Sequence, residues 1–255
     1  MERSPGRRRF IKSVTALTAA GLPSAVAAVE HSQHAPQSAQ PETRLQAYRY
    51  FTQPETAFVE AALSRLIPVD DLGPGAKEAG VAYFIDQQLA GAWGAHARNY
   101  RQGPWPEGTP TQGYQSPLTP QEVYRTAIAE IQRYCNTKYG GTFEALSAAL
   151  QDDVLRDLQQ SKIALELVPA RLFFNMLWAN TQEGFFSDPM YGGNRDKIGW
   201  RLVGFPGVAA AYSEYVEQHN KLYRAVPVSI PDVQQGLTRV DEHGHPVHVL
   251  LSQND

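Results

Sequence analysis

The sequence predicts an all-α protein: an irregular helical bundle with long loops rich in glycine, proline and aromatic residues, and an extended carboxy-terminal tail. Two observations support this prediction. Apolar residues recur at helical spacing behind capping boxes, in which a Thr and a Glu three residues later satisfy the first amides of a helix. No stretch alternates strand and helix patterns, as a parallel sheet would require. At 255 residues and 42% hydrophobic content, the chain can bury a sizeable core.

The first predicted helix begins at the capping box Thr52-Gln53-Pro54-Glu55 and ends before Pro68. Its apolar stripe is Phe58, Val59, Ala62, Leu63 and Leu66. The connector 70–75 holds two acids that could bind calcium, but their spacing matches no known loop, so we favour a plain turn. A second helix is predicted over 76–90, and it buries Val81, Phe84, Ile85 and Leu89.

Residues 91–117 change character, because glycines and prolines there mix with aromatic residues. The aromatic residues are Trp93, Tyr100, Trp105 and Tyr114. A loop of this length is usually functional or pressed against something. Two interpretations stay open: the loop packs on its own protein, or it is an arm that contacts a partner.

Sequence patterns in the second half of the chain predict further helices. The capping box Thr119-Pro120-Gln121-Glu122 starts a helix that ends at about Lys138. Thr142 is expected to cap the next helix, and Asp152-Asp153 another. Very apolar residues predict a helix over 170–181. A last helix is predicted over 208–223, before an extended tail, 224–255.

The first 27 residues resemble a twin-arginine export signal. Arg7 and Arg8 take the paired positions, Phe10 and Ile11 form the apolar pair, and Lys12 follows. A short apolar run comes next, and Ala25-Val26-Ala27 offers a cleavage site with Ala25 and Ala27 as its small residues. We therefore expect 1–27 to be a signal peptide, 28–46 a flexible linker and 47–255 a single helical domain. A basic arm on a cytosolic protein is the less favoured alternative.

Charge and cysteine content exclude several classes of function. Without the signal peptide, 18 basic residues face 25 acidic ones, a net charge of −7, so nucleic acid is not an expected partner. The single cysteine, Cys135, excludes an internal disulfide and an all-cysteine metal site. Cys135 is either a small buried hydrophobe or, in an exported protein, the site of a disulfide to a partner subunit.

The segment Glu183–Gly207 contains six glycines, two prolines and several aromatic residues, a composition that forbids a plain helix or strand throughout it. Tight turns are expected at Asp188-Pro189 and at Tyr191-Gly192-Gly193-Asn194. The turns would hold the aromatic residues against the core or against a larger subunit. The aromatic residues of this segment are Phe185, Phe186, Tyr191, Trp200 and Phe205.

No catalytic motif stands out in the sequence. It lacks a dinucleotide fingerprint, a P-loop, a nucleophile elbow and a haem-attachment motif. Asp188 is better explained as a turn residue than as an acid catalyst. His243, His245 and His248 could supply metal ligands, but a solvated tail is the favoured interpretation.

Within this segment lies a strong family resemblance. Glu183-Gly-Phe-Phe-Ser-Asp-Pro-Met-Tyr-Gly-Gly-Asn194, with Gly199-Trp200 and Gly204-Phe205-Pro206-Gly207, resembles the signature of the gluconate 2-dehydrogenase subunit 3 family. The similarity extends to the twin-arginine head, to Phe51-Thr-Gln-Pro-Glu55 and to Arg65-Leu-Ile-Pro68. The signature positions expected at an interface are Gly184, Phe185, Phe186, Asp188, Pro189, Tyr191, Gly192, Gly193, Asn194, Trp200, Gly204, Phe205, Pro206 and Gly207.

The resemblance implies a non-catalytic small subunit. Such subunits bind a large FAD-containing dehydrogenase subunit of the glucose-methanol-choline type and carry it to the periplasm through the twin-arginine translocation machinery. A multihaem c-type cytochrome subunit often completes the complex at the membrane. This chain itself is expected to hold no cofactor. The rival expectations are a stand-alone periplasmic oxidoreductase and a free export chaperone that leaves its partner.

Overall fold

A computed structural model describes residues 47–251 of the 255, except 107, 110, 114, 209–212, 222, 243, 244 and 248. The predicted signal peptide and the predicted linker, 1–46, therefore lie outside the described residues. So do Tyr114, His243 and His248.

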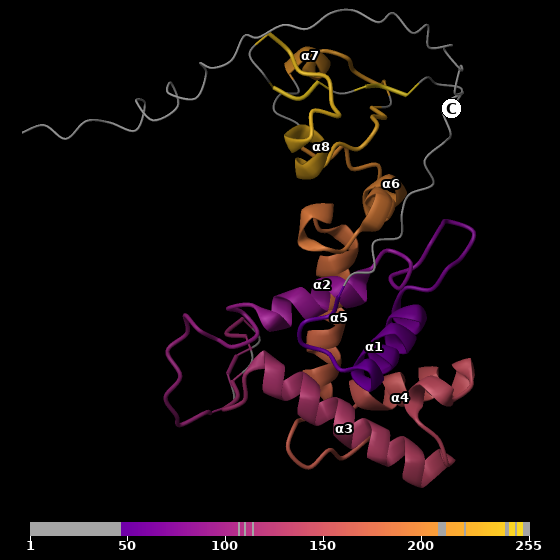
Figure 1. Cartoon of the computed structure of the whole chain (residues 1–255), viewed down its shortest axis with the longest axis vertical. Coiled ribbons are helices and arrows are strands. Elements are labelled where there is room, and N and C mark those ends of the chain that lie inside the picture. The colour runs from indigo at the N-terminus through magenta and orange to yellow at the C-terminus, as the bar shows by residue number, and fades with distance from the viewer. Residues whose placement is uncertain are drawn as a thin grey trace, which may run out of the picture. The chain divides into compact units, whose positions relative to one another are not determined.

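The described residues form an all-α structure, as the sequence predicts, and no strand occurs among them (Figure 1). Isolated bridges join Gly207 to Val228, Ala225 to Leu250 and Val240 to Pro246. The α-helices are α1 (Gln53–Leu66), α2 (Val81–Ala90), α3 (Pro120–Tyr139), α4 (Ala148–Gln159), α5 (Ala170–Phe186), α6 (Ile198–Val203), α7 (Ser213–Val216) and α8 (Ile230–Gln234). Short 3-10 helices are η2 (Phe143–Ala145), η3 (Pro189–Tyr191) and η4 (Arg195–Lys197).

Helix α5 is the centre of the packing. It contacts α1, α2, α3, α4 and α6, and in Figure 1 it lies among the first four helices. Its buried face includes Phe173 and Leu177, and Phe173 meets the rings of Phe58 and Tyr124. The hydroxyl of Tyr124 donates to Asn180 Oδ1 at 2.8 Å, so this buried tyrosine keeps its hydrogen bond. The sequence-predicted apolar faces thus converge on one core.

The two capping boxes start their helices where the sequence places them. At α1, the Glu55 carboxylate accepts the backbone N–H of Thr52 at 2.8 Å. At α3, the Glu122 carboxylate accepts the N–H of Thr119 at 2.7 Å, and the Thr119 hydroxyl accepts the N–H of Glu122 at 3.2 Å. These contacts satisfy amides that have no partner within the helix.

Three predicted helix boundaries in the first part of the chain are wrong. Helix α2 begins at Val81 rather than at 76, because Gly80 takes a left-handed conformation (φ 74°) at the N-cap. Asp152 and Asp153 lie inside α4 and do not cap it, since Ser147 is its N-cap residue. Thr142 precedes only η2, so the helix expected there is a single 3-10 turn.

The later helices also differ from the prediction. Helix α5 continues past 181 to Phe186, so the first residues of the segment Glu183–Gly207 are helical. Of the helix expected over 208–223, α7 covers Ser213–Val216, while 209–212 and 222 lie outside the described residues. Capped by Ser229, α8 interrupts the tail that was expected to be extended.

The loop 91–117 is largely exposed. Between Ala95 and Gln115 none of the residues that the structure describes is buried, and Tyr100 is 86% exposed. Much of the loop therefore faces solvent, although Trp93 and Gly113 line a pocket with Leu172 and Met176 of α5. Within the described part of the chain, no helix has the length and apolar character needed to cross a membrane.

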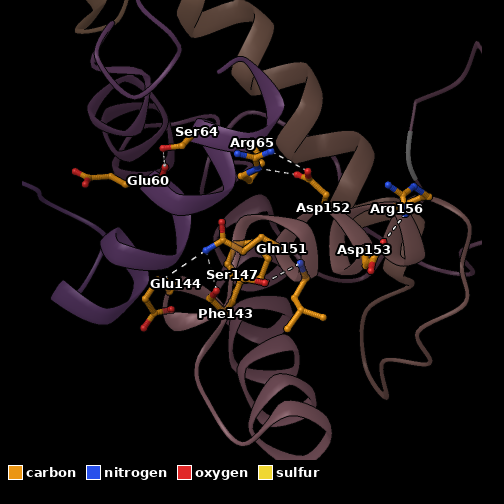
Figure 2. Close-up of polar contacts among 11 residues, drawn as sticks. Glu60, Ser64, Arg65, Phe143, Glu144, Ser147, Gln151, Asp152, Asp153 and Arg156 are labelled. Carbon is orange, nitrogen blue, oxygen red and sulfur yellow. Dashed lines mark hydrogen bonds and ion pairs between the residues drawn. The ribbon is translucent and has the colours of Figure 1, made fainter. Parts of the chain in front are cut away.

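Polar side chains fix the corner between α1, η2 and α4 (Figure 2). The Arg65 guanidinium forms two hydrogen bonds to the Asp152 carboxylate, Nε to Oδ1 at 2.7 Å and a terminal nitrogen to Oδ2 at 2.8 Å. The Gln151 amide donates to the carbonyl oxygen of Phe143 at 3.1 Å. The hydrogen bonds from Arg65 are the main reason that the pKa of Asp152 lies below its ordinary value.

Two buried carboxylates hold chain segments that are distant in sequence. Asp86 on α2 accepts the backbone N–H groups of Arg49, Tyr50 and Phe51 at 2.7 to 2.9 Å. Glu130 on α3 accepts the N–H groups of Glu166 and Leu167. Burial of a carboxylate is tolerated when charge-assisted hydrogen bonds satisfy it. Asp86 thereby holds residues 49–51, which precede α1, against α2.

Candidate interaction site

The segment Glu183–Gly207, which we call the signature segment, starts on the last turn of α5. Gly184 lies where α5 crosses α2: a Cβ atom on it would come within 2.7 Å of the Phe84 ring and 2.9 Å of the Val81 side chain. Only glycine lets the two helices approach this closely. The next two residues divide between the core and the surface, because Phe185 is 1% exposed and Phe186 is 41% exposed.

Asp188 holds the turn that follows α5. Its Oδ1 accepts the N–H of Met190 at 2.9 Å and caps η3, the hydrogen bond expected of an aspartate before proline. Its Oδ2 accepts the N–H of Ile230 at 2.8 Å, at the start of α8. Both oxygens of this carboxylate therefore have structural partners. The second contact could not be read from the sequence, since it joins residues 42 positions apart.

Asn194 closes the loop between α5 and α6. Its side chain is fully buried, its amide nitrogen donates to the Ser187 carbonyl at 2.8 Å, and its Oδ1 accepts the Gly199 N–H at 2.8 Å. Its backbone is left-handed (φ 48°), a conformation that asparagine tolerates better than most residues. Asp196 and Lys197 are left-handed as well.

Glycines allow the loop to lie directly on α5. A Cβ atom on Gly193 would come within 2.2 Å of the Gly184 carbonyl oxygen, and one on Gly199 within 2.1 Å of the Phe185 carbonyl oxygen. Gly192 is left-handed (φ 99°) and lies against the Tyr83 ring. The loop is therefore packed closely against α5.

Trp200 anchors α6. It is 5% exposed, and its indole Nε1 donates to the Phe186 carbonyl at 2.7 Å. The ring of Phe205 meets Trp200 edge to face, with 5.1 Å between centroids. Gly204 is the left-handed C-cap of α6 (φ 69°). Pro206 accepts the Val228 N–H at 3.0 Å, and Gly207 lies so close to Val228 that a Cβ atom would clash.

The aromatic residues of the signature segment thus have two roles. Phe185 and Trp200 belong to the core, whereas Phe186, Tyr191 and Phe205 are between 41% and 49% exposed. Met190 is 46% exposed. We call Phe186, Tyr191 and Phe205 the exposed aromatic set. Rigid aromatic side chains on a fixed backbone are typical of protein interfaces.

An ion pair ties the loop to the tail. Lys197 Nζ lies 2.7 Å from Asp232 Oδ2, and both side chains are about a fifth exposed. Burial favours the neutral form of Asp232. Hydrogen bonds from Lys197 and from Ser229 together outweigh burial, so the pKa of Asp232 lies below its ordinary value.

A groove of about 580 Å³ runs between α6 and the loop after α1. We call it the α6 groove. Its lining is mainly apolar and includes three charged residues, Asp70, Asp196 and Arg201. The apolar lining residues are Leu66, Ile67, Pro68, Leu72, Pro74, Phe185, Ile198 and Leu202. Asp70 and Gly73 close the first wall with reciprocal backbone hydrogen bonds of 3.1 Å, so the connector 70–75 is a tight turn.

Cys135 is buried in α3, and burial raises the pKa of its thiol to about 11. A thiol that is buried and protonated is a poor nucleophile. Its buried position is that of a small core hydrophobe, and the disulfide to a partner subunit stays a prediction. Among the described residues, no group of three His, Cys, Asp or Glu side chains is placed to hold a metal ion. His245 lies 3.2 Å from Asp241.

Comparison with protein families shows which family the chain resembles. A family model described as gluconate 2-dehydrogenase subunit 3 matches residues 53–207, from the first residue of α1 to the last glycine of the signature segment. The match covers more than half of the chain, and the tail lies outside it. Neither the curated proteins nor the solved structures include a match to this chain.

Proposed function

Because the chain belongs to the gluconate 2-dehydrogenase subunit 3 family, we propose that it is the non-catalytic small subunit of an FAD-dependent sugar or sugar-acid dehydrogenase complex. It stabilises the flavoprotein catalytic subunit, and the complex works at the periplasmic side of the membrane. The family match is the observation that carries the proposal. Within the matched range, the polar side chains of the signature segment form hydrogen bonds that fix its backbone. A surface with a fixed backbone is suited to binding a partner protein.

Export belongs to the same proposal. The pair Arg7-Arg8 and the apolar run after it would send the folded chain through the twin-arginine translocation machinery, with the flavoprotein bound. FAD would reside in the partner subunit, and c-type haem in a cytochrome subunit that passes electrons onward. The small subunit itself would carry neither.

The exposed aromatic set supports a docking function. Its side chains lie outside the core, Asp188 and Asn194 fix the turns after Phe186, and the Phe205 N–H donates to the Trp200 carbonyl at 2.9 Å. An interface built on rigid aromatic side chains loses little conformational entropy on binding.

Purification from membranes tests the proposal. The full-length chain, tagged at its carboxy terminus, is isolated in mild detergent, and the eluate is assayed for flavin and for dye-reductase activity on sugars and sugar acids. We expect a large yellow subunit to co-elute and the activity to follow that subunit. Activity from this chain alone would establish the rival oxidoreductase, and elution without a flavoprotein would point to a chaperone that leaves.

A further inference from the structure

The α6 groove is an exposed apolar site with a distinct charge pattern. Leu72 on one wall is 76% exposed and Leu202 on the other is 44% exposed. Val69 and Val203, next to the groove in sequence, are 61% and 59% exposed. Clustered apolar exposure of this kind marks interaction sites on soluble proteins.

Both walls are held in place before any partner arrives. The Ile67 carbonyl accepts the Ala76 N–H at 2.9 Å, and a Cβ atom on Gly75 would come within 2.4 Å of that same oxygen. On the other side, the bond from Gly199 to Asn194 fixes the start of α6. A preformed groove avoids the ordering cost that a flexible site would incur on binding.

The charges in the groove select a basic occupant. Asp196 is exposed, holds a left-handed backbone (φ 55°), and has no ion-pair partner among the described residues. One carboxylate oxygen of Asp70 accepts a hydrogen bond from the Leu72 N–H at 2.9 Å. Against these two acids the lining carries one cation, Arg201. Non-glycine residues in left-handed conformations gather at functional sites, where surrounding structure maintains the strain.

We propose that the α6 groove receives a segment of the flavoprotein subunit that places a leucine-sized apolar side chain between Leu72 and Leu202 and a lysine or arginine against Asp196. The inference rests on the proposed function and names the contact through which that function is exerted. Both walls lie within residues 53–207, so the groove belongs to the part that matches the family and does not need the tail. A second copy of this chain is a poorer occupant. Without the predicted signal peptide the chain carries a net charge of −7, so two copies would repel each other at the acidic groove.

Three single variants of the full chain, each co-expressed with its flavoprotein subunit, test the assignment. Leu202→Asp places a charge in the apolar groove, and Asp196→Asn removes the proposed ionic contact while keeping a residue that tolerates a left-handed backbone. Leu167→Asp is the matched control, since Leu167 is 69% exposed and lies outside the groove lining. The dissociation constant of the purified complex is measured by mass photometry at low and high salt.

Leu202→Asp is expected to raise the Kd by about thirtyfold, as loss of a central apolar contact does. Asp196→Asn should raise it about tenfold at low salt and less at high salt. Leu167→Asp should leave it unchanged. If both groove variants bind like wild type, the groove is not the docking site. If Leu202→Asp only converts a homodimer of this chain to a monomer, the occupant is a second copy and the inference is overturned.

Failure of the proposed function would look different. In that case the wild-type chain itself would bind no flavoprotein, and the groove variants would not differ from it. Thermal unfolding of each variant chain is recorded alongside, so that a weaker complex is counted only when the variant unfolds within the wild-type range.

Discussion

At the scale of single residues, buried polar side chains set the positions of distant backbone segments. Asp86 holds the amides at 49–51, Glu130 those at 166 and 167, and Asn194 bridges Ser187 to Gly199. Hydrogen bonds in a low-dielectric interior are strong when all groups are satisfied and costly when one is lost. The loop between α5 and α6, which carries Tyr191, therefore depends on Asn194.

Replacing Asn194 tests that dependence. Asn194→Gly keeps access to the left-handed backbone but leaves the Gly199 amide and the Ser187 carbonyl without partners, and we expect a loss of about 2–3 kcal/mol in the free energy of unfolding. Asn194→Ala should lose about 1 kcal/mol more, because alanine resists a positive φ. Urea denaturation of the three proteins measures both differences. Equal stability of the glycine variant and wild type would show that the two hydrogen bonds do not hold the loop.

Sequence patterns predicted only part of this residue-level picture. Asp188 before Pro189 indicated a turn, and the structure shows its hydrogen bond to Met190. Its second bond, to Ile230, and the bonds from Asp86 join residues far apart in the chain. Such pairings depend on how helices pack, and no local pattern encodes them. An aspartate at an apolar position of a helix, as Asp86 is, was the one available signal.

At the scale of elements, the contact between α2 and α5 sets the geometry of the signature segment. Gly184 faces the side chains of Val81 and Phe84, and Gly193 lies against Gly184 from the other side. A side chain at Gly184 would push α2 and α5 apart. The loop and α6, which rest on the end of α5, would then move with it.

Gly184→Ala is expected to destabilise the protein. Overpacking against buried Val81 and Phe84 costs more than the roughly 1 kcal/mol that alanine gains over glycine in a helix, for a net loss of about 1–2 kcal/mol. The matched control is Gly141→Ala, where a Cβ atom meets nothing within 4 Å. That variant should unfold within about 0.5 kcal/mol of wild type. Thermal denaturation followed by circular dichroism compares the two, and equal midpoints would contradict the close-contact explanation.

The ion pair between α1 and α4 gives a pH-dependent prediction (Figure 2). Arg65 lowers the pKa of Asp152 in the folded state, so the pair stabilises the fold above the ordinary aspartate pKa of about 3.9 and loses that effect as the pH falls further. Asp152→Asn should cost about 1 kcal/mol at pH 7, a modest value because both side chains are partly exposed. The difference from wild type should shrink below pH 3.9.

Asp153→Asn is the control for this measurement. Among the described residues Asp153 pairs with Arg156 on its own helix, and both side chains are more than half exposed, so little change is expected at any pH. Urea denaturation at pH 7 and at acidic pH compares the variants. A cost at Asp152 that stays constant with pH would mean that its charge does not act through Arg65.

Helix starts were predictable where a local motif encodes them. The capping boxes at Thr52 and Thr119 placed α1 and α3 correctly. The errors arose where tertiary contacts decide the boundary. Gly80 delays α2, and packing against α2 extends α5 to Phe186 although the composition after 183 disfavours a helix. Helix α8 is short and is held by Asp188 and Lys197, contacts that sequence periodicity cannot reveal.

At the scale of the whole molecule, one α-helical core supports the signature segment. The family match spans most of that core and the signature segment, and the all-α class was predicted from helical periodicity, capping boxes and the lack of strand–helix alternation. The sequence left open which aromatic residues are buried and which are exposed. Turn motifs predict the path of the backbone, but the packing of helices decides which side chains are covered. Phe185 and Trp200 fill the core, and Phe186, Tyr191 and Phe205 stay available to a partner.

We propose that this chain carries a flavoprotein subunit across the membrane, and the location of that subunit tests the proposal most directly. Arg7 and Arg8 are both replaced by lysine, and dye-reductase activity and the flavoprotein are quantified in the periplasmic and cytoplasmic fractions. We expect both proteins to remain together in the cytoplasm of the variant cells, while wild-type cells export both. Flavoprotein and activity at wild-type levels in the periplasm of the variant cells would show that this chain does not carry its partner.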